Sequence, residues 1–548
     1  MMRLLAAALL VSVIGCSSSE EGKADTPPTL EVTSPARGTF ADADTVTVSG
    51  RATDKEGPVK VTVGGMAVTP AADGTFTATV PVTPGVDLIE THAIDSAGTD
   101  VRDVRAVLAG TLGPTDGTAK GHVGARAGVT ALRAVGNAVA ATAKTIDFTA
   151  AAQALNPVYN NTGCLGAKID ITSISLTNVG VNLAPQTNVL ATDVTIDNLD
   201  VRLHADFKVA CIGGSTTITI RSSKAHVHGD LAAAITAGKI TTSLPATAVT
   251  LDNFSIDVGG VPGAIESLLK DQARSGVEKA LTSAIKSKVP PIADKALAGL
   301  IAKPVTASLL GHDMTIGITP TKVSITPSEL FVTVDTTLRV AGGEGGTFLT
   351  TDMALTSATM GSSQGLGIAL DDDIVNQLFA GLWAADAFDY TVSIDTIPSL
   401  GAVLDDDARS VELKLSLPPT ASTDSGELEL AIGDLMISVK DDAGAELQSI
   451  AVSITTTVSA EPSQTGKVLL TVGAPTVYAQ VLAQTAAVDD PLTDQQVEAL
   501  ISGVWGLIGV KADDALSKLP MPTIAGISLG APTVTTSTGY VLADMSVN

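Results

Sequence analysis

The chain has 548 residues and a formal net charge of −25, from 33 Lys and Arg against 58 Asp and Glu, and this acidic balance without basic clusters argues against a nucleic-acid partner. Six His and three Cys leave little material for a zinc site, so neither a metal nor another cofactor is expected. Apolar residues make up 45% of the chain and aromatic residues only 3%, and no stretch approaches the ~20 apolar residues that cross a bilayer, so the small aliphatic side chains must be buried elsewhere.

Residues 1–16 have the pattern of a secretory signal, with a positive charge at Arg3 and an apolar run that ends at Gly15. The ending, residues 13–16 (VIGC), resembles the bacterial lipobox. That resemblance implies that Cys16 is diacylated, becomes the new N-terminus and anchors the protein to a membrane. An ordinary signal peptide with a Cys nearby is the alternative.

Residues 17–28 form a polar run that we interpret as a flexible tether. Ser17, rather than Asp, follows the anchor, which by resemblance to enterobacterial sorting favours the outer membrane. The predicted location is therefore the cell envelope, with the protein lipid-anchored, and the face of the membrane stays open.

Residues 29–109 are predicted to form an all-β module. Alternating runs such as 45–48 (TVTV) and 59–63 (VKVTV) place every second side chain on one face. Turn signals rich in Gly, Pro and Asp separate these runs at regular intervals, which favours a β-sandwich.

Three segments of this module, 49–54, 73–76 and 93–98, resemble the immunoglobulin-like modules of bacterial surface proteins, which are usually spacers. Asp54 and Asp95 offer oxygen atoms for calcium. Asp is common in turns, so a turn role is favoured for both.

Two cysteines remain once Cys16 is lipidated, and an exported protein lies in an oxidising compartment. Cys164 and Cys211 are 47 positions apart in strand-rich sequence. We predict a disulfide between them, stabilising the fold by roughly 4 kcal/mol through loop entropy. Two unrelated thiols, or a reactive catalytic Cys, are the alternatives.

Residues 110–122 are predicted to be a linker, followed by two lobes, 123–305 and 306–548, in which strands alternate with a few helices. Examples of the strand-like runs are residues 168–174, 194–199 and 249–256. The last two share a Thr-(Ile/Leu)-Asp-Asn core, which is a weak internal repeat.

Apolar residues at helical spacing predict helices over 126–144 and 263–288, one opening at Asp371 and one opening at Thr493. Pro290 and Pro291 are expected to end the second helix, with a shorter helix continuing over 292–302. Gln496 completes a capping box with Thr493 at the start of the fourth.

The C-terminal half carries an ordered set of motifs. In chain order these are the strand 365–370, a helix holding Asn376 and Trp383, the Pro418 and Pro419 pair after a strand, the segment 426–435, residues 519–522 (LPMP), and Gly539 with Tyr540. This order resembles the C-terminal domain of the tubular lipid-binding proteins related to bactericidal/permeability-increasing protein. The resemblance covers about residues 360–548 by motif order and 123–305 only by layout.

The resemblance implies an α+β fold in which each lobe wraps a long helix in a curved antiparallel sheet and leaves an apolar tube for acyl chains. It further implies a lipid partner, such as a phospholipid, held by the apolar stripes of the second and fourth helices. Those stripes are Ile265, Leu268, Leu269, Val277, Leu281, Ile285, Val497, Leu500, Ile501, Val504, Trp505 and Ile508. An ordinary packed core is the alternative for each of these residues.

The chain departs from the family in two respects. The bactericidal members bind endotoxin phosphates through a basic tip, whereas a net charge of −25 argues against electrostatic recognition of a polyanionic lipid. Their disulfide ties a strand to the second long helix, whereas residues 263–288 contain no Cys.

The serine-hydrolase motif in the sequence lacks the features that catalysis requires. Residues 361–365 match Gly-x-Ser-x-Gly, but a strand-like run follows instead of a helix, and no His occurs after His312. We therefore predict no catalytic residues and no enzyme activity.

Two further patterns are compatible with metal ions. His226 and His228 fall on one strand face, but no third ligand lies near in sequence, so an exposed strand without metal is favoured. The acidic runs 371–373 and 405–407 could attract calcium, but helix capping and solvation are favoured.

Two functions remain. The first is a tethered protein that binds or transfers lipid, with Cys16 as anchor and the β module as spacer. The second is a surface adhesion or structural lipoprotein whose tubular fold has no lipid ligand. The first predicts bound or exchangeable lipid, and the second predicts an interior filled by side chains.

Overall fold

The structure, a computed structural model, describes residues 26–301, 304–351, 355–361, 363–396, 404, 406–462, 468–485, 492–503, 505 and 529–547. Of the predicted site residues, Cys16, Val504 and Ile508 lie outside the described residues. The motif residues Ser362 and 519–522 lie outside them as well.

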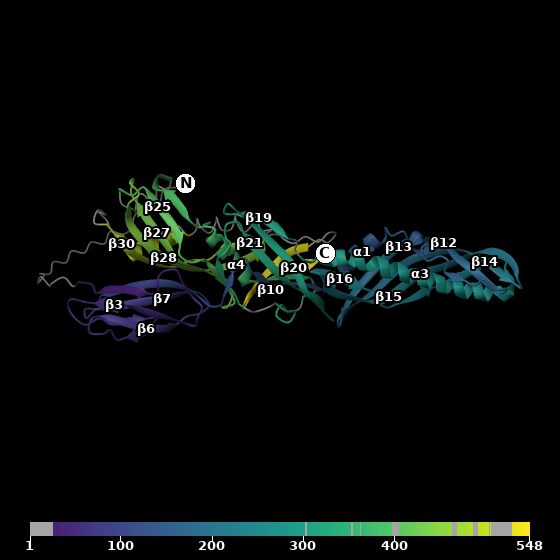
Figure 1. Cartoon of the computed structure of the whole chain (residues 1–548), viewed down its shortest axis with the longest axis horizontal. Coiled ribbons are helices and arrows are strands. Elements are labelled where there is room, and N and C mark those ends of the chain that lie inside the picture. Colours follow the sequence, from purple (N-terminus) through teal and green to yellow (C-terminus); the bar gives the residue numbers. More distant parts are fainter. Residues whose placement is uncertain are drawn as a thin grey trace, which may run out of the picture. The chain divides into compact units, whose positions relative to one another are not determined.

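The chain is α+β, with an N-terminal β-sandwich followed by curved antiparallel sheets and a long helix (Figure 1). It contains two compact units. One comprises the chain up to Ala36 with Val46–Val80 and Ile89–Val104, and the other comprises Arg37–Thr45, Pro81–Leu88 and Arg105–Asn548. Among the described residues, no helix is long and apolar enough to cross a membrane.

The N-terminal module has the short alternating strands that its sequence predicts. They are β1 (Thr29–Ser34), β2 (Thr39–Ala41), β3 (Thr45–Thr53), β4 (Lys60–Val63), β5 (Met66–Val68), β6 (Thr75–Pro81), β7 (Gly85–Ile94) and β8 (Asp100–Ala109). The strand orders are β1-β3-β6 in one sheet and β2-β8-β7-β4-β5 in the other. Inward-facing Val61 and Val63 are fully buried while their neighbour Lys60 is exposed, as period-2 alternation requires.

Beyond the N-terminal module, a large sheet is built on two very long strands. Its members are β11 (Tyr159–Asn160), β12 (Gly166–Ser175), β13 (Asn178–Gln186), β14 (Val189–Val209), β15 (Ile212–Thr236), β16 (Lys239–Ser243), β17 (Thr247–Asp252) and β18 (Ser255–Val258). Strand β14 pairs with β15 along almost its whole length, and β12 and β13 pair with its other edge. The edge of β15 away from β14 pairs with β16, β17 and β18 in succession.

The weak sequence repeat marks irregular positions in this sheet. Asn198 and Asn253 occupy the same place in the repeat, and both adopt left-handed backbone conformations, with φ of 51° and 47°. Asn198 and Ser223 drop out of the β14–β15 pairing, and the side-chain amide of Asn253 donates to Ser223 Oγ. The prediction of one strand over 249–256 is therefore wrong, because the backbone at Asn253 divides it into β17 and β18.

Three helices accompany this sheet: α1 (Val129–Ala143), α2 (Phe148–Gln153) and α3 (Gly263–Ala298). The helix predicted over 126–144 begins three residues later than expected. Residues 126–128 instead extend β10 (Thr118–Gly128), whose pairing with two neighbouring strands outweighs their helical pattern. Helix α2 was not predicted.

The prediction that Pro290 and Pro291 end the long helix is wrong, because α3 runs through both to Ala298. The short helix predicted over 292–302 is therefore not a separate helix, because residues 292–298 belong to α3. Thr242 of β16 holds this region in place, since its hydroxyl donates to Pro290 O at 3.1 Å and to Asp294 Oδ1 at 2.7 Å. Tertiary packing against β16 outweighs the loss of two backbone donors.

A further sheet, which we call the β10 sheet, joins parts of the chain that are far apart in sequence. Its order is β19 (Val305–Leu309), β20 (His312–Thr326), β21 (Glu329–Val340), β10, β23 (Leu366–Asp371), β32 (Tyr540–Val547) and β31 (Leu529–Ser537). Strand β10 lies between β21 and β23, so this sheet crosses the predicted lobe boundary at 305/306. The predicted linker 110–122 contains β9 (Leu112–Pro114), which pairs with β22 (Thr347–Leu349), and the start of β10.

The remaining elements form a further curved sheet and its helices. They are α4 (Asp372–Ala384), β24 (Tyr390–Ser393), a 3-10 turn (Ile394–Thr396), β25 (Ser410–Leu415), β26 (Thr420–Ser422), β27 (Leu428–Lys440), β28 (Glu446–Pro462), β29 (Val468–Val472) and β30 (Thr476–Gln484). Residues 494–503 are helical. The expected capping box is present, because Thr493 N donates to Gln496 Oε1 at 2.8 Å and Gln496 N donates to Thr493 Oγ1 at 3.3 Å.

Candidate lipid-binding site

Helix α3 supplies one wall of the largest apolar core. It contacts strands β11, β12 and β14–β18 and helices α1 and α2. Five of the six residues predicted to bind lipid on this helix are completely buried, and Leu268 is partly buried at the margin of the same core. The buried five are Ile265, Leu269, Val277, Leu281 and Ile285.

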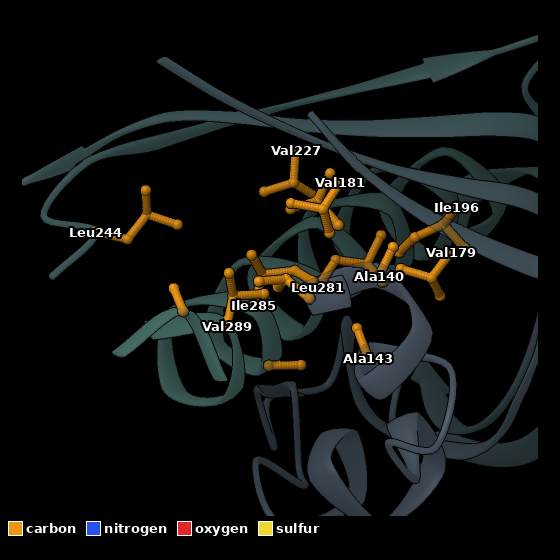
Figure 2. Close-up of a cluster of buried hydrophobic side chains, with 14 of the residues drawn as sticks. Ala140, Ala143, Val179, Val181, Ile196, Val227, Leu244, Leu281, Ile285 and Val289 are labelled. Carbon is orange, nitrogen blue, oxygen red and sulfur yellow. The ribbon is translucent and has the colours of Figure 1, made fainter. Parts of the chain in front are cut away.

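The side chains that face α3 come from several strands of the curved sheet. Figure 2 shows Leu281, Ile285 and Val289 of α3 beside Val181 and Val227 of β13 and β15. These side chains pack on one another, so the helix face that was predicted to line a tube forms a continuous aliphatic core.

Small residues on α3 let the helix lie close to its neighbours. Ala273, Ala280 and Ala284 are buried on the same face. A Cβ added at Gly276 would lie 2.7 Å from Val158 Cγ2, which leaves no room for a larger residue. The composition, rich in Ala and poor in aromatics, thus has a local counterpart in close helix–sheet packing.

A groove of about 620 Å³ runs along the seam between α3 and β17. Its walls are Thr247, Val249, Ser275, Glu278, Lys279, Thr282, Ser283, Lys286 and Ser287. Val249 also packs on the apolar core, so the groove and the core share a wall. Lys286 Nζ donates to Pro245 O at 2.6 Å across this seam.

The polar groove residues were missed from sequence. The groove residues on α3 recur every three to four positions, on the side of the helix opposite the apolar stripe. This spacing is the sequence signal that could have identified them. The partner strand could not be found in the same way, because pairing of β17 with β15 is a non-local contact.

The predicted residues of the fourth helix lie in a separate cluster. Val497 and Trp505 are buried and Ile501 is partly buried, packed with Ile450 and Val452 of β28. Leu500 is half-buried. The indole N–H of Trp505 donates to Gly473 O at 2.9 Å.

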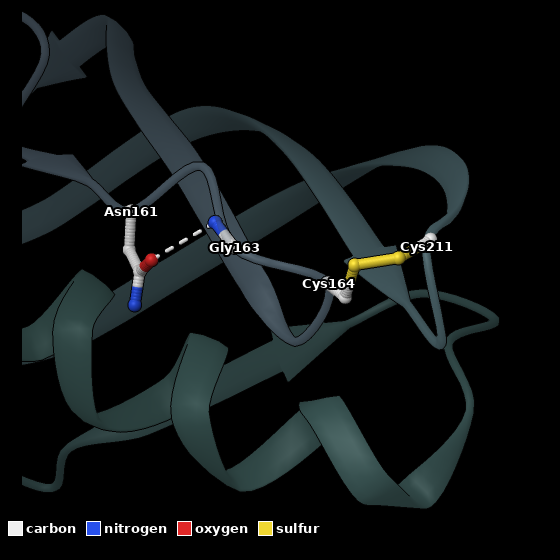
Figure 3. Close-up of a disulfide and its surroundings, with 4 residues drawn as sticks. All are labelled: Asn161, Gly163, Cys164 and Cys211. Atoms are coloured by element: carbon white, nitrogen blue, oxygen red, sulfur yellow. Dashed lines mark hydrogen bonds between the residues drawn. A yellow bond between two sulfur atoms is a disulfide. The ribbon is translucent and has the colours of Figure 1, made fainter.

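The disulfide lies at the turn between the two longest strands. Cys164 and Cys211 are bonded, with their Cα atoms 4.1 Å apart, and Cys211 N also donates to Cys164 O at 3.1 Å (Figure 3). The bond ties the segment before β12 to the β14–β15 turn. Beside it, Ile212 and Leu165 are 76% and 57% exposed, so this turn presents apolar side chains to solvent.

The first acidic run, residues 371–373, was predicted to cap a helix and to be solvated. The cap is present, but the run is buried rather than solvated. Asp371 caps α4, since its Oδ1 accepts from Asp373 N at 3.0 Å. Asp372 Oδ2 accepts from Thr423 N at 3.0 Å, and Asp373 Oδ2 accepts from Thr351 N at 2.7 Å. These local donors replace water, so all three carboxylates lie inside the fold.

His122 of β10 faces this buried cluster. Its Nδ1 is 3.4 Å from Asp371 Oδ1 and 3.2 Å from Asp373 Oδ2. Burial lowers the pKa of His122, but the carboxylates outweigh it and raise the pKa above its ordinary value. Burial, followed by the charge of Asp371, raises the pKa of Asp372 to about 7 and that of Asp373 to about 6.

The other candidate ion ligands are placed differently. Asp95 Oδ1 accepts three backbone N–H groups, from Ala97, Gly98 and Thr99, at 2.7–2.8 Å, which is a turn role. Asp406 and Asp407 are exposed, and Asp405 lies outside the described residues. His226 and His228 lie on the outer face of β15 together with Asp193 of β14, which sequence reasoning missed.

Comparisons with known proteins give one family match. The family model for domain B of glucodextranase matches residues 28–110, which are the N-terminal β-sandwich. No curated protein sequence matches the chain.

The solved structures that are similar to this one include lipopolysaccharide binding protein and latherin. Lipopolysaccharide binding protein is 13% identical, with coverage of 78% of this chain and 99% of that chain and a TM-score of 0.43. Latherin is 14% identical, with coverage of 27% of this chain and 75% of that chain and a TM-score of 0.16. The chain is therefore similar to domain B of glucodextranase over its first module and to lipopolysaccharide binding protein over 78% of its length.

Proposed function

We propose that this protein binds or transfers lipid in the bacterial cell envelope, with no enzymatic step, and that acyl chains enter its aliphatic core through the seam between α3 and β17. One observation carries the proposal: α3 buries its apolar face in a curved sheet, and a groove with polar walls lies directly beside that core. An acyl chain placed in the core would gain ~25 cal/mol for each Å² of apolar surface removed from water.

The core can open at low cost at this seam. Strand β17 is short and, among the described strands, pairs with β15 alone, so moving it away from α3 breaks few hydrogen bonds. Lys279 and Lys286, with the surrounding hydroxyl groups, would contact the headgroup in the groove while the acyl chain replaces side-chain contacts inside.

The envelope location rests on the sequence of residues 1–28. A lipid on Cys16 would hold the protein at a membrane, the outer membrane being the favoured one, and residues 17–28 would let the folded part reach lipid. In this proposal the N-terminal β-sandwich is a spacer.

Lipid binding is tested on the chain carrying Cys16→Ser, purified without detergent. Native mass spectrometry and solvent extraction should find lipid bound, and fluorescent phosphatidylcholine from vesicles should exchange into the protein. Ala284→Phe fills buried space on α3 and should abolish exchange, whereas Ala264→Phe, on the exposed start of the same helix, should leave exchange unchanged. A folded protein that stays free of lipid and does not exchange would contradict the proposal.

A second candidate is a surface adhesion or structural lipoprotein. The observation that favours it is the packing of the α3 stripe, five of whose six members are fully buried against protein side chains. It predicts that lipid does not slow amide hydrogen exchange in β17 or α3. Slower exchange in those two elements on addition of phosphatidylcholine would favour the lipid-binding function instead.

A further inference from the structure

The outer face of the β14–β15 pair brings two imidazoles and a carboxylate together. His226 and His228 stand on the same face of β15, with their rings stacked 5.4 Å apart and only 9° between the planes. Asp193 projects from β14, where it is the direct cross-strand partner of His228. The three residues therefore converge through the strand register.

The distances within this cluster fit ligands of one metal ion. His226 Nδ1 is 3.1 Å from Asp193 Oδ2, and His228 Nδ1 is 3.2 Å from Asp193 Oδ1. Ligand atoms of a tetrahedral site with bonds of about 2.0–2.1 Å lie about 3.3–3.4 Å apart. A turn of each ring about its side-chain bonds would direct both Nδ1 lone pairs to a point beside the carboxylate.

A fourth residue lies beside one of the two rings. Asp252 Oδ2 of β17 is 3.7 Å from His226 Nε2, on the far side of the imidazole from Asp193. A carboxylate in this position favours the proton on Nε2 and leaves Nδ1 free to bind metal, as in carboxylate–histidine–zinc arrangements. The sequence motif alone contained neither carboxylate.

The surroundings favour a cation. Asp230 lies two residues beyond His228 on the exposed face of β15, and Lys224, two residues before His226 on the same strand, is paired with Asp197 at 3.5 Å. The cluster is also open to solvent, with side-chain exposures of 24% for His226, 50% for His228 and 29% for Asp193. Solvent can therefore complete the coordination.

We propose that His226, His228 and Asp193 form a binding site for one divalent transition-metal ion of the zinc type. Two imidazole nitrogens and one carboxylate oxygen suit zinc, and they disfavour calcium and magnesium, which prefer oxygen ligands alone. The site lies on the solvent face of the sheet, whereas the apolar core lies on the other face, so metal binding is independent of the lipid proposal.

The test is zinc titration of untagged protein by isothermal calorimetry in the presence of 1 mM Mg²⁺ and Ca²⁺ (roughly extracellular concentrations, and weak competitors for imidazole). One Zn²⁺ per chain should bind with saturation in the micromolar range. His226→Ala, His228→Ala and Asp193→Asn should each weaken binding at least 10-fold, and Asp252→Asn by about 10-fold through loss of the second-shell carboxylate.

The matched control is His204→Ala. His204 is an exposed histidine of β14, and its Nε2 lies 3.2 Å from Asp206 Oδ1. This pair offers one imidazole, whereas the proposed site offers two. This variant should bind zinc like the original chain. Absence of saturable binding, or binding that survives both His226→Ala and His228→Ala, would overturn the proposal. Circular dichroism of each variant separates loss of a ligand from loss of the fold.

Discussion

Arg126 is a buried cation that joins several strands and loops at the β10 sheet. It is 1% exposed near the C-terminal end of β10, and its guanidinium donates to Met360 O and Gly361 O at 2.6 Å and pairs with Asp544 of β32. Glu329 of β21, 2% exposed, lies 4.0 Å away. The Arg126 guanidinium thus contacts two backbone carbonyls and two carboxylates.

We predict that Arg126→Met lowers the free energy of unfolding by about 3–5 kcal/mol, because it leaves the Glu329 carboxylate buried without its cation. Urea unfolding followed by tryptophan fluorescence measures this, since both tryptophans, Trp383 and Trp505, lie in the larger compact unit. Arg133→Met, on the exposed face of α1, is the control and should change stability by less than about 0.5 kcal/mol. Equal effects of the two substitutions would contradict the role of Arg126.

The buried cluster of His122 and Asp371–Asp373 predicts an unusual pH dependence. The pKa values of Asp372 and Asp373 are raised to about 7 and about 6, and that of His122 is raised as well. A raised folded-state pKa stabilises the fold below the unfolded pKa and loses that stabilisation as the pH rises through the folded value. All three groups act in the same direction, so stability should fall between about pH 4 and pH 7.

Thermal unfolding from pH 4 to pH 8 measures this dependence. Asp372→Asn removes the group with the highest carboxyl pKa in the cluster and should flatten the decline. Asp271→Asn, at an exposed position of α3, should leave it unchanged. A midpoint that rises steadily from pH 4 to pH 7 in the original chain would contradict the prediction.

These residues show what the sequence could and could not predict at this scale. Asp371 as a helix cap follows from three consecutive Asp residues before an apolar helical pattern. Burial of the carboxylates does not follow, because Thr350, Thr351 and Thr423, which donate to them, come from separate loops. Arg126 was assigned to a helix, since its place in β10 depends on strands more than 200 residues away.

Among the elements, α3 departs most from local rules. A proline inside a helix costs about 3 kcal/mol relative to Ala, and α3 contains two in succession. Pro290 is buried and held by the Thr242 hydroxyl, while Pro291 is exposed. The sequence therefore predicted a helix end where the structure has a continuous helix.

We predict that Pro291→Ala raises the free energy of unfolding by roughly 1–2 kcal/mol, because Ala restores an N–H donor and a helix-favouring residue without disturbing the core. Part of the gain is offset by greater freedom of the unfolded chain. Urea unfolding is again the measurement. If the helix ended at the prolines, the same substitution would destabilise the protein instead, so the sign decides between the two descriptions.

At the same scale, helix positions were predicted better than strand partners. The apolar stripe of α3 and the capping box at Thr493 depend on residues within one or two turns. The partners of Asp193 and Val249 depend on the register of β14, β15 and β17, which no local pattern specifies. The sequence consequently indicated His226 and His228 but not Asp193, and the strand wall of the groove was beyond sequence reasoning.

For the molecule as a whole, composition predicted the type of interior, strand alternation predicted the N-terminal β module, and the fold class of the remainder came from the family resemblance. An acidic chain rich in Ala, Val, Leu and Ile but poor in aromatics forms a β-sandwich and curved sheets around an aliphatic core. The β10 sheet could not be predicted, because β10, β21, β23 and β32 are brought together from positions between 118 and 547. Composition contains no information on such long-range pairing.

The net charge of −25 makes a prediction about the lipid surface from which this protein would take its ligand. Like charges repel over about 30 Å at 0.01 M salt and about 10 Å at 0.1 M. Lipid uptake from phosphatidylcholine vesicles should therefore be faster than from phosphatidylglycerol vesicles at low salt, and the difference should shrink as salt is raised. Stopped-flow transfer of a fluorescent lipid, measured at both salt concentrations with the Cys16→Ser chain, tests this. Faster uptake from the anionic vesicles at low salt would mean that a local basic surface, such as Lys279 and Lys286 of the groove, outweighs the charge of the whole molecule.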